Sequence, residues 1–275
     1  MPSFYRSYDL ENPKKLMETL KVASFDRLTT LMERFTLQLI PADPERATLV
    51  ASVDEAGMPS HILFGASGIG RGIDPGKVLL SVAVDWGGVD NPLMAALPKR
   101  FEFALAQDVE MASVVGLMRS ELIAGRCGAA SVINRLGEVL IVRLLRAQIE
   151  AGSAGPGLIA GLSDPRLSRA IVAMHDQPGL EWRNRDLAVI AGLSLSRFAE
   201  TFMTLVGETP AAYLRRWRLS LARQDILKGD RVDAVARRYG YGSPEGFARA
   251  FRQRYGRNPL DVRLRAPNLA DAVDK

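Results

Sequence analysis

The sequence contains one pattern twice: residues 187–210 read LAVIAGLSLSRFAETFMTLVGETP, and residues 235–259 read VARRYGYGSPEGFARAFRQRYGRNP. The opening of the pattern, Leu-Ala or Val-Ala followed by a glycine, returns 48 positions later. The continuation, with two phenylalanines, a glycine and a proline, returns 49 positions later. A single residue inserted between the two parts of the second copy explains the change of offset. The repeat predicts two copies of one supersecondary unit.

Each copy has the pattern of a helix-turn-helix. A short helix ends at Gly192 or Gly240, where glycine can adopt a positive φ, and a small polar residue then caps a second helix. The second helix carries two phenylalanines four positions apart, which places them on one face toward the core. These pairs are Phe198 with Phe202 and Phe247 with Phe251. The opposite face is available to a DNA major groove. One copy alone would fit a generic helical hairpin equally well.

The net charge of +5 is unevenly distributed along the chain. Residues 1–163 have 16 Lys and Arg against 18 Asp and Glu, whereas residues 164–265 have 19 against 11, a net charge of +8. Eighteen of those 19 cations are arginines, and the guanidinium group suits phosphate and guanine edges. Charge alone would also fit a solvated basic face without a partner. Together with the two copies, it favours DNA binding.

The segment between the two copies, Pro210 to Leu227, predicts one spacer helix with an apolar face through Trp217. Trp182 and Trp217 are expected in the core, because each stands beside helical apolar positions. Arg218 lies nearer the apolar side, so we expect a structural ion pair for it.

Upstream of residue 151 the periodicity changes. Residues 151–157 (AGSAGPG) form the clearest linker, so we expect an effector or dimerisation domain over 1–150 and a DNA-binding domain over 158–265. Short helices are expected from Asn12-Pro13 and over residues 25–34. Four strands are expected over 47–53, 60–66, 77–86 and 101–106, within a strand region of about 40–106. Two long helices follow over 108–124 and 129–150. The second is apolar on two sides and therefore needs two neighbours, such as the strands and a second subunit.

Composition excludes several classes of protein. The chain has 275 residues, of which 47% are apolar, so it can bury a sizeable core. Every apolar run is interrupted by charges or glycines, so no membrane span is expected. The N-terminus does not resemble a secretory signal. Cys127 is the only cysteine, which fits a reducing compartment. We expect a cytoplasmic protein that does not contact membranes.

The sequence shows little sign of catalysis. The two histidines, His61 and His175, lie in different expected domains, and no metal-ligand or nucleophile motif accompanies them. No metal, cofactor or enzymatic activity is therefore expected. A redox-sensing Cys127 is an alternative, but the chain offers it no resolving partner.

Residues 164–263 resemble the DNA-binding domain of AraC/XylS-type transcription regulators. The resemblance is carried by both copies and by the closing motif GYGSPEGFARAFRQRYGRNPLDVR at residues 240–263. It implies seven helices with two helix-turn-helix units. More loosely, the motifs at residues 164–166, 175–182, 91–93 and 97–98 resemble the subgroup with a cupin effector domain. The chain is thus expected to be an α+β protein of two domains, with a cupin-like β domain and helical hairpin before an all-α domain. Four strands are about half of a cupin barrel, so the barrel is expected to lack its first half.

Carried over by position, the base-reading residues of that family fall on Ser196, Arg197 and Glu200 in the first copy, and on Ser243, Glu245 and Arg249 in the second. Glu200 departs from the basic or amide residue common there. Its carboxylate can only accept hydrogen bonds, for example from cytosine N4, and the alternative is that DNA phosphate repels it. The expected phosphate contacts, with solvated surface as the alternative, are Arg215, Arg216, Arg252 and Arg254.

The expected function is that of a sequence-specific transcription regulator that responds to a ligand through its N-terminal domain. The alternative is a constitutive DNA binder whose N-terminal domain serves only dimerisation or interaction. Double-stranded DNA is the main expected partner. Further candidate partners are RNA polymerase, a small-molecule effector, and a second copy of the chain bound through helices 108–150.

Overall fold

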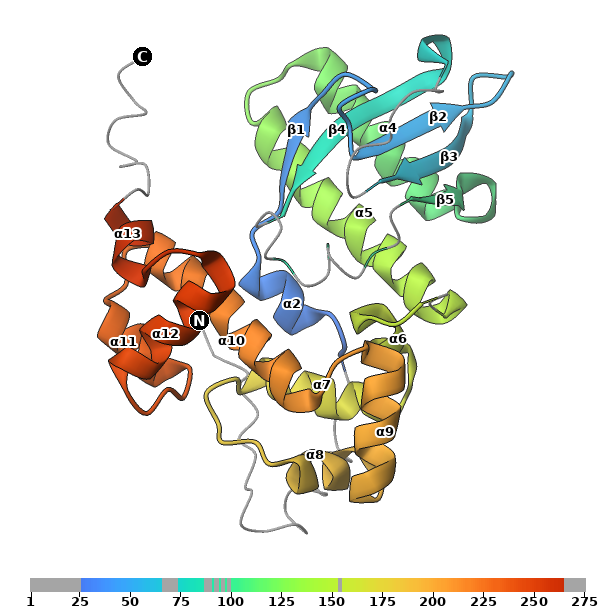
Figure 1. Cartoon of the computed structure of the whole chain (residues 1–275). Coiled ribbons are helices and arrows are strands. Elements are labelled where there is room, and N and C mark those ends of the chain that lie inside the picture. The colour runs from blue at the N-terminus through green and yellow to red at the C-terminus, as the bar shows by residue number, and fades with distance from the viewer. Residues whose placement is uncertain are drawn as a thin grey trace. The chain divides into compact units, whose positions relative to one another are not determined.

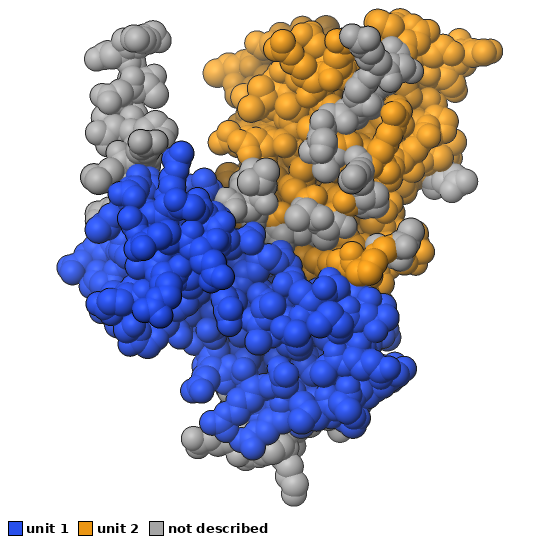
Figure 2. Space-filling view, in the orientation of Figure 1, with its two compact units in different colours: residues 1–30, 164–275 blue, residues 31–163 orange. Residues whose placement is uncertain are grey.

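The computed structural model of the chain describes residues 26–65, 74–86, 91, 94, 97, 100–152 and 155–264. It contains two compact units, coloured separately in Figure 2. One unit spans residues 31–163, and the other combines residues up to Thr30 with those from Asp164 onward. The limits derived from the sequence, 1–150 and 158–265, remain predictions.

The first unit is built on an antiparallel sheet of five strands (Figure 1). The strands are β1 (Gln38–Pro41), β2 (Leu49–Val53), β3 (Pro59–Phe64), β4 (Val78–Asp85) and β5 (Phe101–Ala104), and their order in the sheet is β1-β4-β2-β3-β5. The four predicted strands are all present, each somewhat shorter than expected. In β4 the buried residues alternate, with Leu80, Val82 and Val84 on the core face, as a half-buried strand requires.

Strand β1 was not among the four predicted strands. It has only four residues, and Leu39 alone is buried. One apolar core position gives no alternation to recognise. Its pairing partner is the distant strand β4, where Leu39 stands opposite Val84.

Helices cover the sheet (Figure 1). The helical elements described between residues 29 and 163 include α2 (Thr29–Arg34), the 3-10 turns η1 (Pro75–Lys77) and η3 (Leu105–Gln107), α4 (Val109–Ala124), α5 (Ala129–Ala151) and α6 (Leu158–Ser163). Helix α2 begins later than predicted, because the Asp26 carboxylate accepts hydrogen bonds from the amides of Leu28 and Thr29 and forms a turn there. The helix expected from Asn12-Pro13 lies outside the described residues.

Helix α5 approaches β1 closely. A Cβ added to Gly137 would lie 2.0 Å from Leu39 Cδ1, so only glycine allows this packing. The Asn134 side-chain oxygen also accepts a hydrogen bond from the Leu39 amide at 2.8 Å. The other side of α5 exposes Val132 and Val139, which are 42% and 47% exposed.

From Asp164 onward the described chain is helical. Its elements are α7 (Leu167–Asp176), α8 (Asn184–Ala191), α9 (Leu195–Val206), α10 (Pro210–Leu227), α11 (Val232–Arg238), α12 (Pro244–Tyr255) and α13 (Pro259–Leu264). Seven helices within residues 164–264 are the number that the resemblance implied. None of the described helices is by itself long and apolar enough to cross a membrane, although the bent pair α8 and α9 would pass by length and composition alone.

Candidate nucleic-acid interface

The first copy of the repeat folds as a helix-turn-helix. Helix α8 ends at Gly192, whose φ is +67°, a value that L side chains rarely adopt. Ser194 then caps α9, because its hydroxyl accepts a hydrogen bond from the Arg197 amide. Phe198 and Phe202 are fully buried, and their rings meet edge to face with centroids 5.7 Å apart. The predicted glycine, cap and phenylalanine pair are confirmed.

The second copy repeats this construction with a longer turn. Gly240 has a φ of +71° after α11, and Ser243 caps α12 by accepting from the Gly246 amide at 3.1 Å. Phe247 and Phe251 are fully buried. The capping serine follows the glycine by three positions here and by two in the first copy. The predicted insertion therefore lies in the turn and leaves both helices intact.

Helix α10 is the predicted spacer, with the predicted bounds. Tyr213 on its first half packs edge to face on Phe202 of α9, with centroids 5.7 Å apart. Its second half meets the end of α11 through Asp225, which pairs with Arg238 at 2.5 Å and accepts from the hydroxyl of Tyr239, the next residue, at 2.7 Å. One continuous helix thus contacts both helix-turn-helix units.

A buried histidine lies at the centre of this arrangement. His175 on α7 packs against Trp217 with ring centroids 4.4 Å apart and ring planes tilted by 35°. Its Nε2 is 2.5 Å from the Tyr213 hydroxyl. Burial, with a further contribution from the Arg216 cation, lowers the pKa of His175 from 6.5 to about 3, so the imidazole is neutral at physiological pH. Trp217 is in the core as predicted, whereas Trp182 is only partly buried.

Arg218 on α10 makes no ion pair within the part of the chain that the structure describes, in contrast to the prediction. Its Nε donates to the carbonyl oxygen of Pro178 at 2.5 Å, and its Nη2 donates to that of Leu180 at 2.7 Å. Burial lowers the pKa of this guanidinium. The interpretation of Arg218 as structural was correct, but its partners are backbone carbonyls on a loop, which hydropathy patterns do not reveal.

The candidate base-reading residues of the first helix-turn-helix lie together on the exposed face of α9. Ser196, Arg197 and Glu200 are all exposed. Arg197 Nη1 donates to Glu200 Oε2 at 2.9 Å, and the two side chains are 62% and 66% exposed. Met203 and Thr204 are also exposed, one turn further along the helix. Their spacing of three and four from Glu200 places them beside it on the same face.

The corresponding residues of α12 have the same formal charges, but their arginine has a different environment. Glu245 and Arg249 are exposed and lie on the face opposite the phenylalanine pair. No carboxylate of the described chain lies within ion-pair distance of Arg249. Ser243 is exposed, but its oxygen already accepts the capping hydrogen bond; the hydroxyl hydrogen remains available as a donor.

The four candidate phosphate-binding arginines have different environments. Arg215 is exposed on α10. Arg216 is partly buried, and both its Nε and Nη2 donate to Glu208 Oε1. Arg252 donates to the Asn258 side chain at 2.9 Å, and the guanidinium of Arg254 lies 5.5 Å from the Tyr255 ring centroid.

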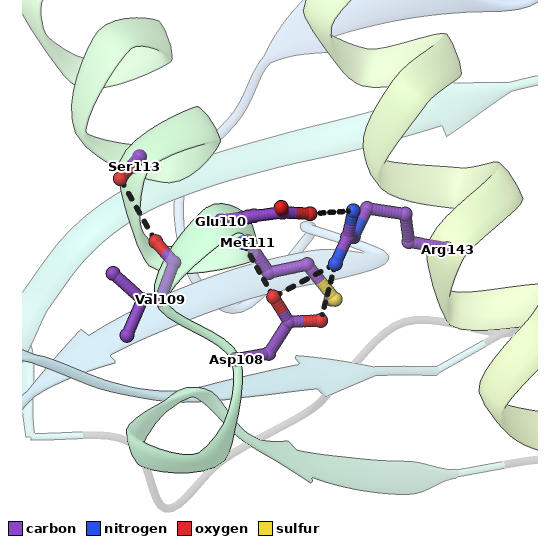
Figure 3. A network of polar contacts seen from close by, with 6 residues as sticks. All are labelled: Asp108, Val109, Glu110, Met111, Ser113 and Arg143. Atoms are coloured by element: carbon purple, nitrogen blue, oxygen red, sulfur yellow. Dashed lines mark hydrogen bonds and ion pairs between the residues drawn. The ribbon is translucent and has the colours of Figure 1, made fainter.

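The sheet unit has a polar network of its own (Figure 3). Arg143 on α5 donates from Nη2 to both carboxylate oxygens of Asp108 at 2.9 Å, and from Nη1 to Glu110 at 2.5 Å. Asp108 also caps α4 by accepting from the Met111 amide. Burial acts to raise the pKa of Asp108, but the hydrogen bonds from Arg143 and Met111 outweigh it and hold that pKa below its usual value. The network fixes the start of α4 on α5.

Groups suited to catalysis or metal binding are sparse. The described residues contain no cluster of three or more His, Cys, Asp or Glu side chains that could hold a metal ion. His61 is half exposed, with its Nε2 4.0 Å from Glu102. Cys127 is exposed in the turn between α4 and α5.

Several known proteins are similar in sequence to parts of this chain. An AlkR HTH-type transcriptional regulator from Acinetobacter baylyi is 31% identical over 179 residues, which is 63% of this chain and 58% of that protein. A Streptomyces antibioticus protein assigned as an AraC-like transcription regulator is 36% identical over 134 residues, 48% of this chain and 44% of that protein. The chain thus spans about half the length of the curated relatives that it matches.

Among solved structures, the DNA-binding domain of AdpA in complex with a target DNA is similar, with 28% identity and a TM-score of 0.34 over 37% of this chain and 91% of that chain. Residues 35–150 match the cupin family, and residues 187–265 match a helix-turn-helix domain family. The chain therefore carries a segment similar to cupins, followed by a segment similar to helix-turn-helix domains.

Proposed function

We propose that the protein is a sequence-specific, DNA-binding transcription regulator and not an enzyme. The observation that carries the proposal is the pair of helices α9 and α12. Each exposes polar side chains opposite a buried phenylalanine pair. Helix α9 packs on α10, and α12 meets α10 where the Arg223 guanidinium lies 5.7 Å from the Tyr255 ring centroid. Two such helices in a unit with a large excess of arginine suit two segments of major groove.

In this proposal α12 supplies a cationic reading helix. Arg249 has no competing carboxylate within ion-pair distance in the described chain, so its guanidinium is available to donate to guanine O6 and N7. The Ser243 hydroxyl donates beside it. Glu245 lies in the first turn of the helix, where the helix dipole stabilises its negative charge. Its carboxylate accepts a hydrogen bond from cytosine N4.

Helix α9 reads with a different chemistry. Its Glu200 carboxylate accepts from cytosine N4, and Arg197 screens that carboxylate from the DNA phosphates through the 2.9 Å ion pair. Ser196 adds a small donor and acceptor at the start of the helix. The ion pair thereby allows the Glu200 carboxylate to approach the negatively charged DNA.

Arg215, Arg252 and Arg254 serve in the proposal as phosphate contacts, because each is exposed. Arg216 is the weakest of the four candidates, since Glu208 already occupies its guanidinium. Phosphate contacts add affinity and salt dependence without sequence information.

The test uses the full chain and a duplex selected by it from a random pool. We expect enrichment of one sequence class and binding to it at least about 10³-fold tighter than to a scrambled duplex. The logarithm of the association constant should fall linearly with the logarithm of salt concentration, with a slope of about −0.9 for each neutralised phosphate. A chain that enriched no sequence would contradict the proposal.

We further propose that the cupin unit controls this binding through a small-molecule effector and through homodimerisation. An open groove of about 660 Å³ lies against α5, lined in part by Phe35, Val142 and Arg146. Exposed apolar side chains on α4 and α5 provide a contact face for a second copy; they are Val109, Leu117, Ile123, Val132 and Val139. RNA polymerase is a further candidate partner, and the site of action is the bacterial cytoplasm, where the chromosome lies.

Two measurements separate a regulated from a constitutive DNA binder. Analytical ultracentrifugation of the full chain and of a Leu117→Glu, Ile123→Glu variant should show loss of a dimer in the variant. A metabolite extract should change the DNA affinity of the full chain and leave residues 158–275 unaffected. A full chain whose DNA affinity the extract does not change would favour the constitutive alternative.

A further inference from the structure

The loop that precedes the first helix-turn-helix touches the turn of the second. A Cβ added to Gly179 would lie 2.3 Å from the carbonyl oxygen of Arg238, and one added to Gly240 would lie 2.5 Å from that of Gly179. The two backbones are therefore in direct contact, although about 60 residues separate them in the sequence. Only glycine at these positions permits such an approach.

Arg218 on the spacer helix α10 stabilises this contact. Its guanidinium spans the carbonyls of Pro178 and Leu180 at 2.5 and 2.7 Å. Its Nη2 also lies 3.3 Å from the position that a Cβ on Gly240 would take. A planar guanidinium can hold two acceptors in fixed geometry, which a lysine ammonium cannot reproduce.

Both sides of the contact are internally fixed. In the loop, the Leu180 amide and the Trp182 indole both donate to the Gln177 carbonyl, and α8 begins two residues after Trp182. On the other side, Arg238 at the end of α11 forms ion pairs with Asp225 and Asp230. A displacement at the contact would therefore be passed to α8 and α9 on one side and to α11 and α12 on the other.

We propose that Arg218 is a positioning residue that sets the spacing between the two recognition helices, and hence the number of base pairs between the two half-sites. The inference rests on the proposed function, because it assumes that α9 and α12 read one duplex. Arg218 itself contacts no DNA in this proposal. It acts through the loop at residues 177–181 and the turn at residues 239–243.

The geometry of DNA makes this role measurable. One turn of about 10 base pairs spans roughly 34 Å, so a single inserted base pair moves one half-site by about 3.4 Å and rotates it by roughly 35°. A rigidly joined pair of helices cannot follow that change and loses contacts at one half-site. A loosened pair can follow it.

The experiment measures the affinity of the full chain for a spacing series. The duplex is the one selected by the wild-type chain, with its half-sites mapped by footprinting and with one base pair deleted, unchanged or inserted between them. For wild type we expect a penalty of roughly tenfold or more for either change, the cost of losing at least one base contact. For Arg218→Lys, the penalty should fall below about threefold, and binding to a duplex with the α12 half-site alone should stay within about twofold of wild type.

Gly179→Ala tests the same contact without touching the arginine. Gly179 is not at a positive φ, so alanine is conformationally allowed and only its Cβ forces the loop and the turn apart. For this variant too, the affinity penalty for deleting or inserting a base pair should fall below about threefold. The matched controls are Arg237→Lys, at an exposed arginine paired with Asp233, and Gly116→Ala, where an added Cβ meets no atom within 4 Å. Both should keep the wild-type profile.

Thermal denaturation of each variant accompanies the titrations. Folded Arg218→Lys and Gly179→Ala proteins that kept the full wild-type spacing penalty would overturn the inference. So would an equal loss of affinity on all duplexes, which would assign Arg218 a purely structural role. A wild-type chain that bound every sequence and spacing alike would instead contradict the proposed function, and this inference with it.

Discussion

Arg197 and Glu200 form an ion pair on the exposed face of α9, with Nη1 and Oε2 2.9 Å apart. Both side chains are more than half exposed, so the pair adds little to stability. Its effect is electrostatic, because the only carboxylate of the first candidate reading set is neutralised before DNA arrives. The candidate reading face of α9 is thus nearly neutral, whereas Arg249 on α12 has no carboxylate within ion-pair distance among the described residues.

Glu200→Gln should change specificity more than affinity. The amide keeps an acceptor oxygen but adds a donor, and it releases Arg197. We expect a cytosine within the α9 half-site to lose about 1–3 kcal/mol of preference, with binding to scrambled duplexes strengthened. Titration of wild type and variant on duplexes with each base at that position measures this. Unchanged base preference would remove Glu200 from the reading set.

Arg249→Ala and Arg215→Ala should have distinct effects. Arg249 follows Phe247 by two positions, about 200° around the helix, so it points away from the core and toward the groove. Its removal should cost about 1–3 kcal/mol on the selected duplex and relax preference at one position. Arg215→Ala should weaken all duplexes similarly and flatten the salt slope by about one unit. Equal losses on selected and scrambled duplexes for Arg249→Ala would show that it does not read bases.

His175 should make stability depend on pH. Its pKa is about 3 in the folded chain against 6.5 as the ordinary value, so between these values the unfolded chain binds a proton that the folded chain does not. The contribution of His175 to the free energy of unfolding is greatest above pH 6.5. It falls as the pH decreases below that value, by about 1.4 kcal/mol per pH unit. The stability advantage of wild type over His175→Gln should therefore shrink by about 2 kcal/mol between pH 6.5 and 5. The free energies of unfolding come from denaturant titrations followed by tryptophan fluorescence, and a difference between the two proteins that stayed constant with pH would show that His175 is not responsible.

Gly137→Ala should destabilise the sheet unit. The added methyl would overlap Leu39, which β1 holds against α5, and overpacking of this kind costs about 1–3 kcal/mol. Gly116→Ala on α4 is the control: it meets no neighbour and should stabilise the helix by up to about 1 kcal/mol. Urea unfolding of both variants makes the comparison. Equal stability of the two variants would contradict the close packing of β1 on α5.

The sequence predicts best those features whose cause is local. Gly192, Gly240, Ser194 and Ser243 occupy the predicted turns and caps because positive φ and helix capping depend on residues within a few positions. The spacer helix also has its predicted bounds, set by Pro210 at its start and Gly229 after its end.

Features that depend on distant partners were not predictable in this way. Strand β1 exists through pairing with β4 and contact with α5, and neither leaves a pattern in four residues. The carbonyl partners of Arg218 and the pairing of Arg143 with Asp108 join segments 35 or more positions apart. Side chains at such positions look like ordinary surface arginines until the helices that carry them are placed.

Footprinting of the full chain on its selected duplex, at a measured stoichiometry, tests the central claim most directly. The two recognition helices are joined through α10, so each bound chain should protect two major-groove segments whose centres lie about 10 base pairs apart on one face of the duplex. In a guanine-methylation interference assay, Arg249→Ala should abolish the signal in one segment and leave the other. Protection of a single segment per chain would show that only one unit reads DNA and would contradict the account.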